Sequence, residues 1–369
     1  MLQPNEQKRL RHVVIGAGAG IFKLHQDGLA LPTAELVGVA DVNPAARSRL
    51  EAETGAPFFT DHKRMLAELK PDVAVVITPH PYHAPLAIDC LEAGCHVLVE
   101  KPIAVQAAEA DAMVAAAQKA NRLLAVNFQQ RLRPEAVALR KLLDEGRLGD
   151  IQHVEMSATW TRTALYFQNA GWRGTWKGEG GGVLMNQAPH NMDLLCYLVG
   201  QPQKVVAWTR TLLHDIETED TVQAMLEWAN GATGSFHVST AQAGKPFWFE
   251  IIGTKGIVQW DAKGIELQLF EPDVRTHIAE SDQMYASPAV HAATVELPET
   301  RGHHEAIYRN LHDAILNGAP LVAPGDEAAQ SLELANAMIL SSYAGKQVEL
   351  PLARAEYAEL LARLCEVVR

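Results

Sequence analysis

Short apolar runs alternate with amphipathic stretches through the first third of the 369-residue chain. The runs are rich in β-branched residues, and they read RHVVIGAG, AELVGVAD, DVAVVITP, HVLVEKP and LLAVNF. Between them lie stretches such as NPAARSRLEAETG and HAPLAIDCLEAG, whose pattern suits helices. Because strands that are apolar on both faces need helices on both sides, this pattern predicts a doubly wound α/β domain with a parallel sheet.

The pattern changes after about residue 127. From Ile151, segments such as IQHVEMSATW, KVVAWTRTL, TVQAMLEW and TGSFHVSTA alternate apolar and polar residues, as strands with one covered face do. FWFEIIGTKGIVQW predicts a hairpin about a Thr-Lys-Gly turn. We expect an antiparallel or mixed sheet, then helices from about His303 to the C-terminus. We place the domain boundary at Ala125, which gives domains 1–125 and 126–369.

The net charge and the length of the apolar runs argue against two classes of partner, nucleic acids and membranes. The 44 acidic and 32 basic residues give a net charge of -12, and no stripe of lysine or arginine is present, which argues against nucleic acid. The longest apolar runs are far below the roughly 20 residues that span a membrane. Residues 1–16 pass from a charged start directly into a strand without a signal-peptide core, so we expect a cytoplasmic protein with no membrane partner.

The four cysteines and fifteen histidines lack the spacing of known metal sites. We therefore expect no metal, and thiols that are reduced and buried. The cysteines are Cys90, Cys95, Cys196 and Cys365.

A glycine-rich turn follows the first strand in VVIGAGAGIFKLH. Gly16 and Gly18 would allow a tight turn and a close approach of the backbone to a pyrophosphate, which the N-terminus of the next helix favours. In the usual spacing the third small residue falls at Ile21, whereas the glycine stands one place earlier, at Gly20. The alternative is a strand-to-helix loop without a ligand.

Asp41 ends the second strand, 25 residues beyond Gly16. A carboxylate there can accept hydrogen bonds from the adenosine ribose hydroxyls and would repel a 2'-phosphate. We therefore expect the cofactor to be NAD rather than NADP. The alternative is that Asp41 caps a helix in ADVNPAA.

Glu100, Lys101 and Pro102 follow the fourth apolar run. Ligands of doubly wound sheets gather beyond the carboxyl ends of the strands, so we expect Lys101 to face the cofactor cleft. Its ammonium could hydrogen-bond the reacting oxygen of a substrate, with Glu100 orienting or tuning it. Taken alone, a Glu-Lys pair is more often a solvated surface pair.

Several motifs occur together across nearly the whole chain. They are GAGAG with Asp41, TPHPYHAPLAIDCLEAGCHVLVEKPIA, GRLGDIQHV, GWRGTW and GGGVLMNQAPHNMDLLCYLVGQP. Jointly they resemble the Gfo/Idh/MocA family of NAD(P)-dependent oxidoreductases. The resemblance implies an N-terminal Rossmann domain and a C-terminal α+β domain for substrate binding, whose open, largely antiparallel sheet would form a homodimer or homotetramer. It also implies hydride transfer at a carbinol carbon of a sugar or cyclitol.

The resemblance assigns roles to individual residues. Lys101 and His190 match the family's catalytic lysine and histidine, so we expect His190 to move the hydroxyl proton while Lys101 stabilises the substrate oxygen. Residues matching cofactor contacts are Thr78, Pro79, His80 and His83 in the loop bordering the nicotinamide, Glu100, and the pair Trp172 and Arg173. The alternatives are loop packing for His80 and His83, and a core histidine for His190.

The stretch GEGGGVLMNQAPHNMDLL places small residues before His190, which would let its helix approach the cleft. Asn186 stands four residues before His190, where the family often has an aspartate. We expect the amide to orient the substrate and to leave His190 without a carboxylate partner at that position. The alternative is that Asn186 caps a helix beginning near Ala188. Asp193 would either hydrogen-bond the ring of His190 or face the sheet.

Substrate contacts are expected from NFQQR, ALYFQNAGWRG and NQAPHN, because amides, aromatics and arginines suit a polyhydroxylated ligand. The candidates are Lys101, Asn127, Tyr166, Arg173, Asn186, Gln187 and His190.

Two other functions remain open from the sequence. Some members of the family are glycosidases that use transient NAD-dependent oxidation, so bond cleavage without net NADH is one alternative. A catalytically inactive NAD-binding sensor is the other, and the retention of both Lys101 and His190 argues against it.

Overall fold

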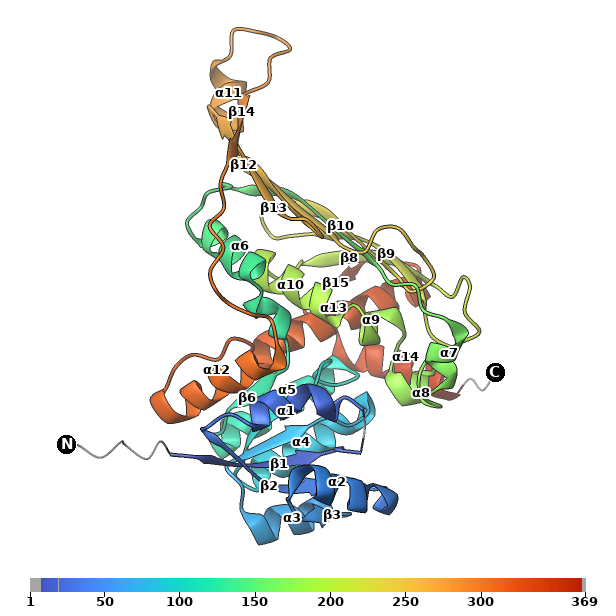
Figure 1. Ribbon diagram of the computed structural model, residues 1–369. Coiled ribbons are helices and arrows are strands. Elements are labelled where there is room, and N and C mark those ends of the chain that lie inside the picture. Colours follow the sequence, from blue (N-terminus) through green and yellow to red (C-terminus); the bar gives the residue numbers. More distant parts are fainter. Residues whose placement is uncertain (1–7, 19, 367–369) are drawn as a thin grey trace, which may run out of the picture. The chain divides into compact units, whose positions relative to one another are not determined.

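The computed structural model describes residues 8–18 and 20–366 (Figure 1). The chain divides into two compact units. One contains the residues up to Leu132 together with Arg301–Leu332, and the other contains Arg133–Thr300 together with the residues from Glu333.

The first unit is built on a six-stranded parallel sheet in the order β3-β2-β1-β4-β5-β6, which confirms the predicted Rossmann arrangement. Its strands are β1 (Leu10–Ile15), β2 (Ala34–Ala40), β3 (Phe58–Phe59), β4 (Val73–Val76), β5 (His96–Val99) and β6 (Leu124–Val126). The five runs predicted from the apolar pattern are β1, β2, β4, β5 and β6. The strand β3 was not predicted, because two residues are too few to show a period.

Helices cover this sheet. They are α1 (Phe22–Leu29), η1 (Pro44–Ala46), α2 (Arg47–Thr54), α3 (His62–Leu69), η2 (His80–Tyr82), α4 (His83–Glu92), α5 (Ala107–Ala120), η3 (Gln129–Leu132) and α12 (His304–Asn317). The two predicted amphipathic stretches, NPAARSRLEAETG and HAPLAIDCLEAG, correspond to η1 with α2 and to α4. All four residues of β4 are fully buried, as expected for a central strand with helices on both faces.

The helix α12 returns to the first unit from late in the chain. It packs against α1, where the Tyr308 hydroxyl lies 3.0 Å from His25 Nδ1. Its His312 lies 2.7 Å from Thr33 Oγ1. From the sequence we expected every residue after 125 to belong to the second domain. The structure divides the chain differently, because an amphipathic pattern shows that a helix buries one face but not which sheet covers that face.

The second unit carries a nine-stranded sheet in the order β14-β13-β12-β11-β7-β10-β9-β8-β15. Its strands are β7 (Ile151–Thr159), β8 (Lys204–Arg210), β9 (Thr221–Glu227), β10 (Thr233–Ser239), β11 (Trp248–Gly253), β12 (Gly256–Asp261), β13 (Gly264–Glu271), β14 (Ala289–Ala293) and β15 (Val348–Glu349). β7 and β10 pair in parallel and the other neighbours are antiparallel, which confirms the expected open, largely antiparallel sheet.

One face of this sheet is covered by helices of the same unit, with α9 and α10 against its central strands (Figure 1). The helices of this unit, whether or not they cover the sheet, are α6 (Pro134–Asp144), α7 (Ala164–Gln168), α8 (Trp176–Glu179), α9 (Val183–Asn186), α10 (Pro189–Val199), α11 (Val274–Glu280) and α14 (Arg354–Glu366). A further helix, α13 (Gly325–Ala344), begins in the first unit and ends in the second. On the strands, buried and accessible positions alternate, and Trp208 and Met225 are about half exposed. No described helix is long and apolar enough to cross a membrane.

Candidate active site

The glycine turn after β1 is shaped for a close approach of the backbone. Gly16 has φ +92°, and a Cβ there would lie 2.7 Å from Thr78 Cγ2. A Cβ on Gly18 would lie 2.4 Å from Asp41 Oδ2, so a side chain there would displace the Asp41 carboxylate. Ile21 is the N-cap residue of α1, and Gly20 has nothing within 4 Å of its Cβ position. The turn and the N-terminus of α1 form a cradle that fits a pyrophosphate.

Asp41 lies at the carboxyl end of β2, beside this turn. Its Oδ2 accepts the backbone N–H of Gly18 at 2.8 Å, and its Oδ1 accepts the N–H of Asn43 at 2.9 Å. The cap residue of η1 is Asn43, whose side chain accepts the N–H of Ala45. The alternative of Asp41 as a helix cap is therefore not what the structure shows, and its carboxylate stands next to the cradle.

The loop after β4 is tied to the loop after β5 by His83. Its Nδ1 lies 2.8 Å from the carbonyl oxygen of Pro102, and its Nε2 lies 2.7 Å from that of Thr78. A neutral ring can donate to only one of these carbonyls. Burial lowers the pKa of His83, although both contacts favour its charged form. His83 is fully buried and His80 nearly so. Thr78 and Pro79 lie between β4 and η2.

Glu100 anchors the segment that carries Lys101. Its Oε2 accepts the backbone N–H of Lys101 at 3.2 Å, and its Oε1 accepts a hydrogen bond from the Asn127 amide. Both Glu100 and Asn127 are buried, at 7% and 0% exposure, so Asn127 lies inside the first unit rather than on its surface. Lys101 itself is partly exposed at the carboxyl edge of β5.

Two histidines from distant helices complete the surroundings of Glu100. His25 Nε2 of α1 lies 3.0 Å from Glu100 Oε1, and His304 Nε2 of α12 lies 3.4 Å from the same atom. Burial opposes ionisation of Glu100, but the hydrogen bonds and positive charge of the two imidazoles outweigh it and hold the pKa of this carboxyl well below its usual range.

These three side chains are also a geometric candidate for a cation, because their ligand atoms lie within 4.8 Å of one another. Sequence spacing could not have found this group, since its members are 75 and 204 positions apart along the chain. The N–H of Asn127 points at the same oxygen of Glu100 that both rings approach. The Asn127 amide therefore already donates to that oxygen and would compete with a metal for it.

In the second unit, Tyr166 is the centre of the predicted substrate-binding side chains. Arg173 lies over its ring, with the guanidinium carbon 4.3 Å from the ring centroid, and donates to its backbone carbonyl at 3.1 Å. The Tyr166 hydroxyl donates to Asn186 Oδ1 at 3.1 Å and accepts from Gln187 Nε2 at 2.8 Å. Trp172 is 5.4 Å from the Arg173 guanidinium. The structure thus brings together the residues predicted from two separate motifs.

Glu179 belongs to the same group of side chains but was not predicted from the sequence. This side chain, 1% exposed at the end of α8, accepts the backbone N–H of Gly174 at 2.8 Å and a hydrogen bond from the Asn186 amide. Burial, followed by the charge of Glu219, raises its pKa to about 7, although its hydrogen bonds and Arg173 oppose the shift. The only signal in the sequence was its place before the glycine run.

The glycines that follow allow the chain to press against Glu219. A Cβ on Gly182 would lie 1.9 Å from the Glu219 carbonyl oxygen, which no side chain permits. At the same segment, the Glu219 side chain accepts two backbone hydrogen bonds at Oε1, from the N–H of Gly182 at 2.9 Å and from the N–H of Leu184 at 3.1 Å. Burial is the main cause that raises the pKa of Glu219 to about 7.

Asn186 does not cap the following helix. The N-cap residue of α10 is Ala188, which makes no side-chain cap hydrogen bond, and Pro189 opens the helix. Asn186 instead ends α9, so it and His190 do not share one continuous helix as the spacing suggested. His190 lies in the first turn of α10 and is partly exposed, whereas Asp193 is fully buried.

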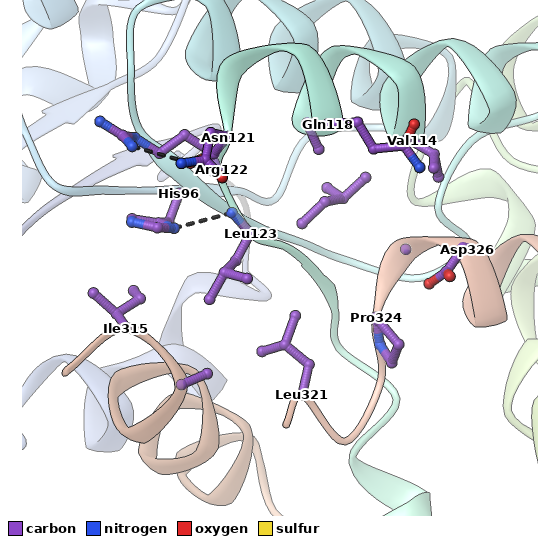
Figure 2. A pocket seen from close by; sticks show the side chains of 14 residues that line it. His96, Val114, Gln118, Asn121, Arg122, Leu123, Ile315, Leu321, Pro324 and Asp326 are labelled. Atoms are coloured by element: carbon purple, nitrogen blue, oxygen red, sulfur yellow. Dashed lines mark hydrogen bonds between the residues drawn. The ribbon is translucent and has the colours of Figure 1, made fainter. Parts of the chain in front are cut away.

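A hollow of ≈ 430 Å³ lies elsewhere in the first unit (Figure 2). It opens at the amino ends of β5 and β6, where His96 Nδ1 accepts the N–H of Leu123 at 3.0 Å. Ile315 and Leu321 line it from the segment around α12. Because cofactors of such sheets bind at the carboxyl ends of the strands, this hollow is separate from the candidate site.

The fold, the glycine turn and Asp41 together define a dinucleotide-binding oxidoreductase. Comparison with known families supports this: the NAD-binding Rossmann fold of the GFO_IDH_MocA oxidoreductase family matches residues 10–128, and the GFO/IDH/MocA C-terminal domain matches residues 136–259. The chain belongs to the Gfo/Idh/MocA family of NAD(P)-binding oxidoreductases.

Individual relatives agree with this assignment. The WlbA dehydrogenase from Bordetella pertussis, solved with NADH and UDP-GlcNAcA, is 32% identical with a TM-score of 0.80, and the match covers 94% of this chain and 100% of that one. Inositol 2-dehydrogenase of Rhizobium meliloti is 27% identical, over 92% of this chain and 99% of the relative. D-glucoside 3-dehydrogenase of Escherichia coli is 33% identical, but the match spans only 52% of this chain and 55% of that enzyme. These relatives are dehydrogenases, and scyllo-inositol 2-dehydrogenase of Bacillus subtilis, which is 25% identical over 73% of this chain and 76% of the relative, is named for NADP(+).

Proposed function

We propose that this protein transfers hydride between a carbinol carbon of a sugar or cyclitol and NAD, with Lys101 and His190 as its catalytic residues. The observation that carries the proposal is the placement of Lys101 at the carboxyl edge of β5, with its backbone fixed by the buried Glu100. Ligands gather at that edge in doubly wound sheets. The names of several relatives, dehydrogenases of glucosides and inositols, support this substrate class.

In the direction of alcohol oxidation, His190 takes the hydroxyl proton of the substrate, and Lys101 stabilises the negative charge that develops on its oxygen. A bound nicotinamide would supply the acceptor for the hydride. Tyr166 and Gln187 orient neighbouring hydroxyls of the substrate, with Arg173 stacked on the Tyr166 ring. Ketone reduction uses the same groups in reverse.

The choice of NAD over NADP rests on Asp41. Its carboxylate beside Gly18 would meet a 2'-phosphate with like charge and would lose its hydrogen bonds to the ribose hydroxyls, at a cost of about 1 to 3 kcal/mol. We expect kcat/KM to favour NAD by at least about tenfold. Equal or better use of NADP by the purified protein would overturn this choice.

A panel of sugars and cyclitols tests the reaction itself. Net formation of NADH over many turnovers supports a dehydrogenase, whereas cleavage of a glycoside without net NADH indicates the redox glycosidase. Cofactor binding with no turnover of any substrate indicates a sensor. A co-crystal structure with NAD and the best substrate then identifies the carbon that is oxidised.

The assembly and compartment belong to the same proposal. A homodimer or homotetramer would form through the uncovered face of the nine-stranded sheet, where Trp208 and Met225 are half exposed. A cytoplasmic location is consistent with four free cysteines, three of them buried.

A further inference from the structure

The Asn186 amide is held from both of its ends. Its Nδ2 donates to Glu179 Oε1, and its Oδ1 accepts the Tyr166 hydroxyl at 3.1 Å and Gln187 Nε2 at 3.3 Å. Three of the proposed substrate-binding side chains therefore form one hydrogen-bonded chain. Glu179 is the buried end of that chain.

Glu179 uses both carboxylate oxygens as acceptors. Oε2 accepts the N–H of Gly174, and Oε1 accepts the Asn186 amide. An ionised carboxylate can only accept, so it requires the amide to turn its nitrogen inward and its oxygen toward Tyr166. At 1% exposure, Glu179 has little water to replace these partners.

We propose that Glu179 is a positioning residue of the reaction, which acts through Asn186 to hold the amide oxygen and the Tyr166 hydroxyl in the orientation that binds substrate. This proposal rests on the proposed function of the site. In it, Glu179 acts through Asn186 and does not itself contact the substrate.

Protonation of Glu179 would break this arrangement. A proton on Oε1 would meet the N–H of Asn186, so the amide would have to rotate and withdraw its oxygen from Tyr166. The charged groups that act on Glu179 are Glu219, which precedes β9 and raises its pKa, and Arg173, which precedes α8 and lowers it. Lys177 lies on the same short helix, and α14, which packs against α8, brings the Cys365 thiol near Lys177. With a pKa of about 7, the change would occur near neutral pH.

The direct test is the side-chain 15N–1H signal of Asn186, followed by NMR from pH 5.5 to 8.5 and assigned by its absence from Asn186→Ser. In the wild type we expect it to titrate with a midpoint near pH 7. In Glu179→Gln the signal should no longer titrate. A wild-type signal that does not change, or one that titrates equally in Glu179→Gln, would overturn the proposal.

Glu219→Gln is the matched control, because it removes a second buried carboxyl that does not contact Asn186. The Asn186 signal should still titrate in this variant, with its midpoint moved to lower pH, since a negative charge beside Glu179 is gone. A midpoint that moves to higher pH would contradict the assignment to Glu179. If Glu179→Gln fails to fold, the wild type and this control still decide the question.

Kinetics provide the second readout. With the substrate found for the proposed function, Glu179→Gln should lower kcat/KM at pH 8 by about tenfold. The reason is that both oxygens of Glu179 accept hydrogen bonds, from Gly174 and Asn186, whereas the NH2 group of a glutamine would face one of these two donors. The acidic limb of its pH profile should lose one of two ionisations, leaving that of His190, while NADH binding is unchanged. Failure of the proposed function would appear as no turnover in any variant and would leave the NMR result intact; an unaltered limb in an active variant would refute the positioning role.

Discussion

Two buried glutamates, each hydrogen-bonded to an asparagine amide, stand beside the proposed chemistry in the two units. Glu100 accepts from Asn127 and is 7% exposed, and Glu179 accepts from Asn186 and is 1% exposed. Yet the pKa of Glu100 is held well below its usual range, whereas that of Glu179 is raised to about 7.

The difference comes from the neighbours beyond the amide. Glu100 faces His25 and His304, which can carry positive charge, whereas the charge that most strongly raises the pKa of Glu179 is that of Glu219. Burial opposes ionisation in both cases. The same residue pair therefore forms a permanent anion that anchors Lys101 in one unit, and a group that changes charge near neutral pH in the other.

The strongest way to break this comparison is Glu100→Gln. This substitution leaves the imidazoles of His25 and His304 without their carboxylate. It should therefore lower the free energy of unfolding at pH 7 by about 3 to 5 kcal/mol. Because the folded-state pKa is depressed, this stability is present above the ordinary pKa of about 4.5 and is lost as the pH falls. Chemical unfolding from pH 3 to 8 should show a weaker acid loss in the variant than in the wild type. An equal loss would mean that Glu100 is not the anion described here.

Glu219→Gln tests a pH dependence of stability that is opposite in sign to that of Glu100, because the pKa of Glu219 is raised. The raised pKa of Glu219 gives a contribution that is fully present below about pH 4.5 and is lost as the pH rises through about 7. That loss amounts to roughly 3 kcal/mol in the wild type. The free energy of unfolding measured from pH 4.5 to 8 should fall less steeply in the variant. Identical slopes would show that Glu219 is already ionised throughout.

Lys101→Ala and His190→Ala test the catalytic role proposed for one residue in each unit. Loss of an electrostatic or acid-base partner should lower kcat by about a hundredfold in each variant. NADH titration, followed by fluorescence, should show cofactor binding in both, which separates chemistry from folding. A variant that keeps more than about a tenth of the wild-type kcat would contradict the role of the residue it lacks.

Asn186→Asp gives the smallest and most specific effect. The new carboxyl would face Glu179, and two close carboxylates retain one proton between them. In Asn186→Asp alone, we expect the rising limb of kcat/KM for alcohol oxidation to move to alkaline pH by less than about 0.5 unit. When Asn186→Asp is combined with Glu179→Gln, the shift should be about 1 unit, because the new charge can then act on His190. Equal shifts in the two backgrounds would show that Glu179 does not govern this position.

The two glutamates also show how far the sequence could predict the site. Lys101 and the glycine turn were predictable, because a strand end in a parallel sheet has a fixed place relative to the ligand edge. The contact between Asn186 and Glu179 was not, because the pattern could not show that α9 ends before α10 begins. Asn127 was predicted to bind substrate from its residue type, but its side chain is fully buried against Glu100.

The sequence by itself determined five of the six strands of the parallel sheet, the hairpin of β11 and β12 and the family, since these depend on local periodicity and on motifs continuous in the chain. Only the tertiary structure decided that α12 returns to the first unit, that His25 and His304 meet Glu100, and that Glu219 lies near enough to Glu179 to raise its pKa. Periodicity records that a residue is buried, but the charge of a buried group depends on neighbours brought from distant parts of the chain. For that reason the ionisation of these two carboxyls is a property of the fold.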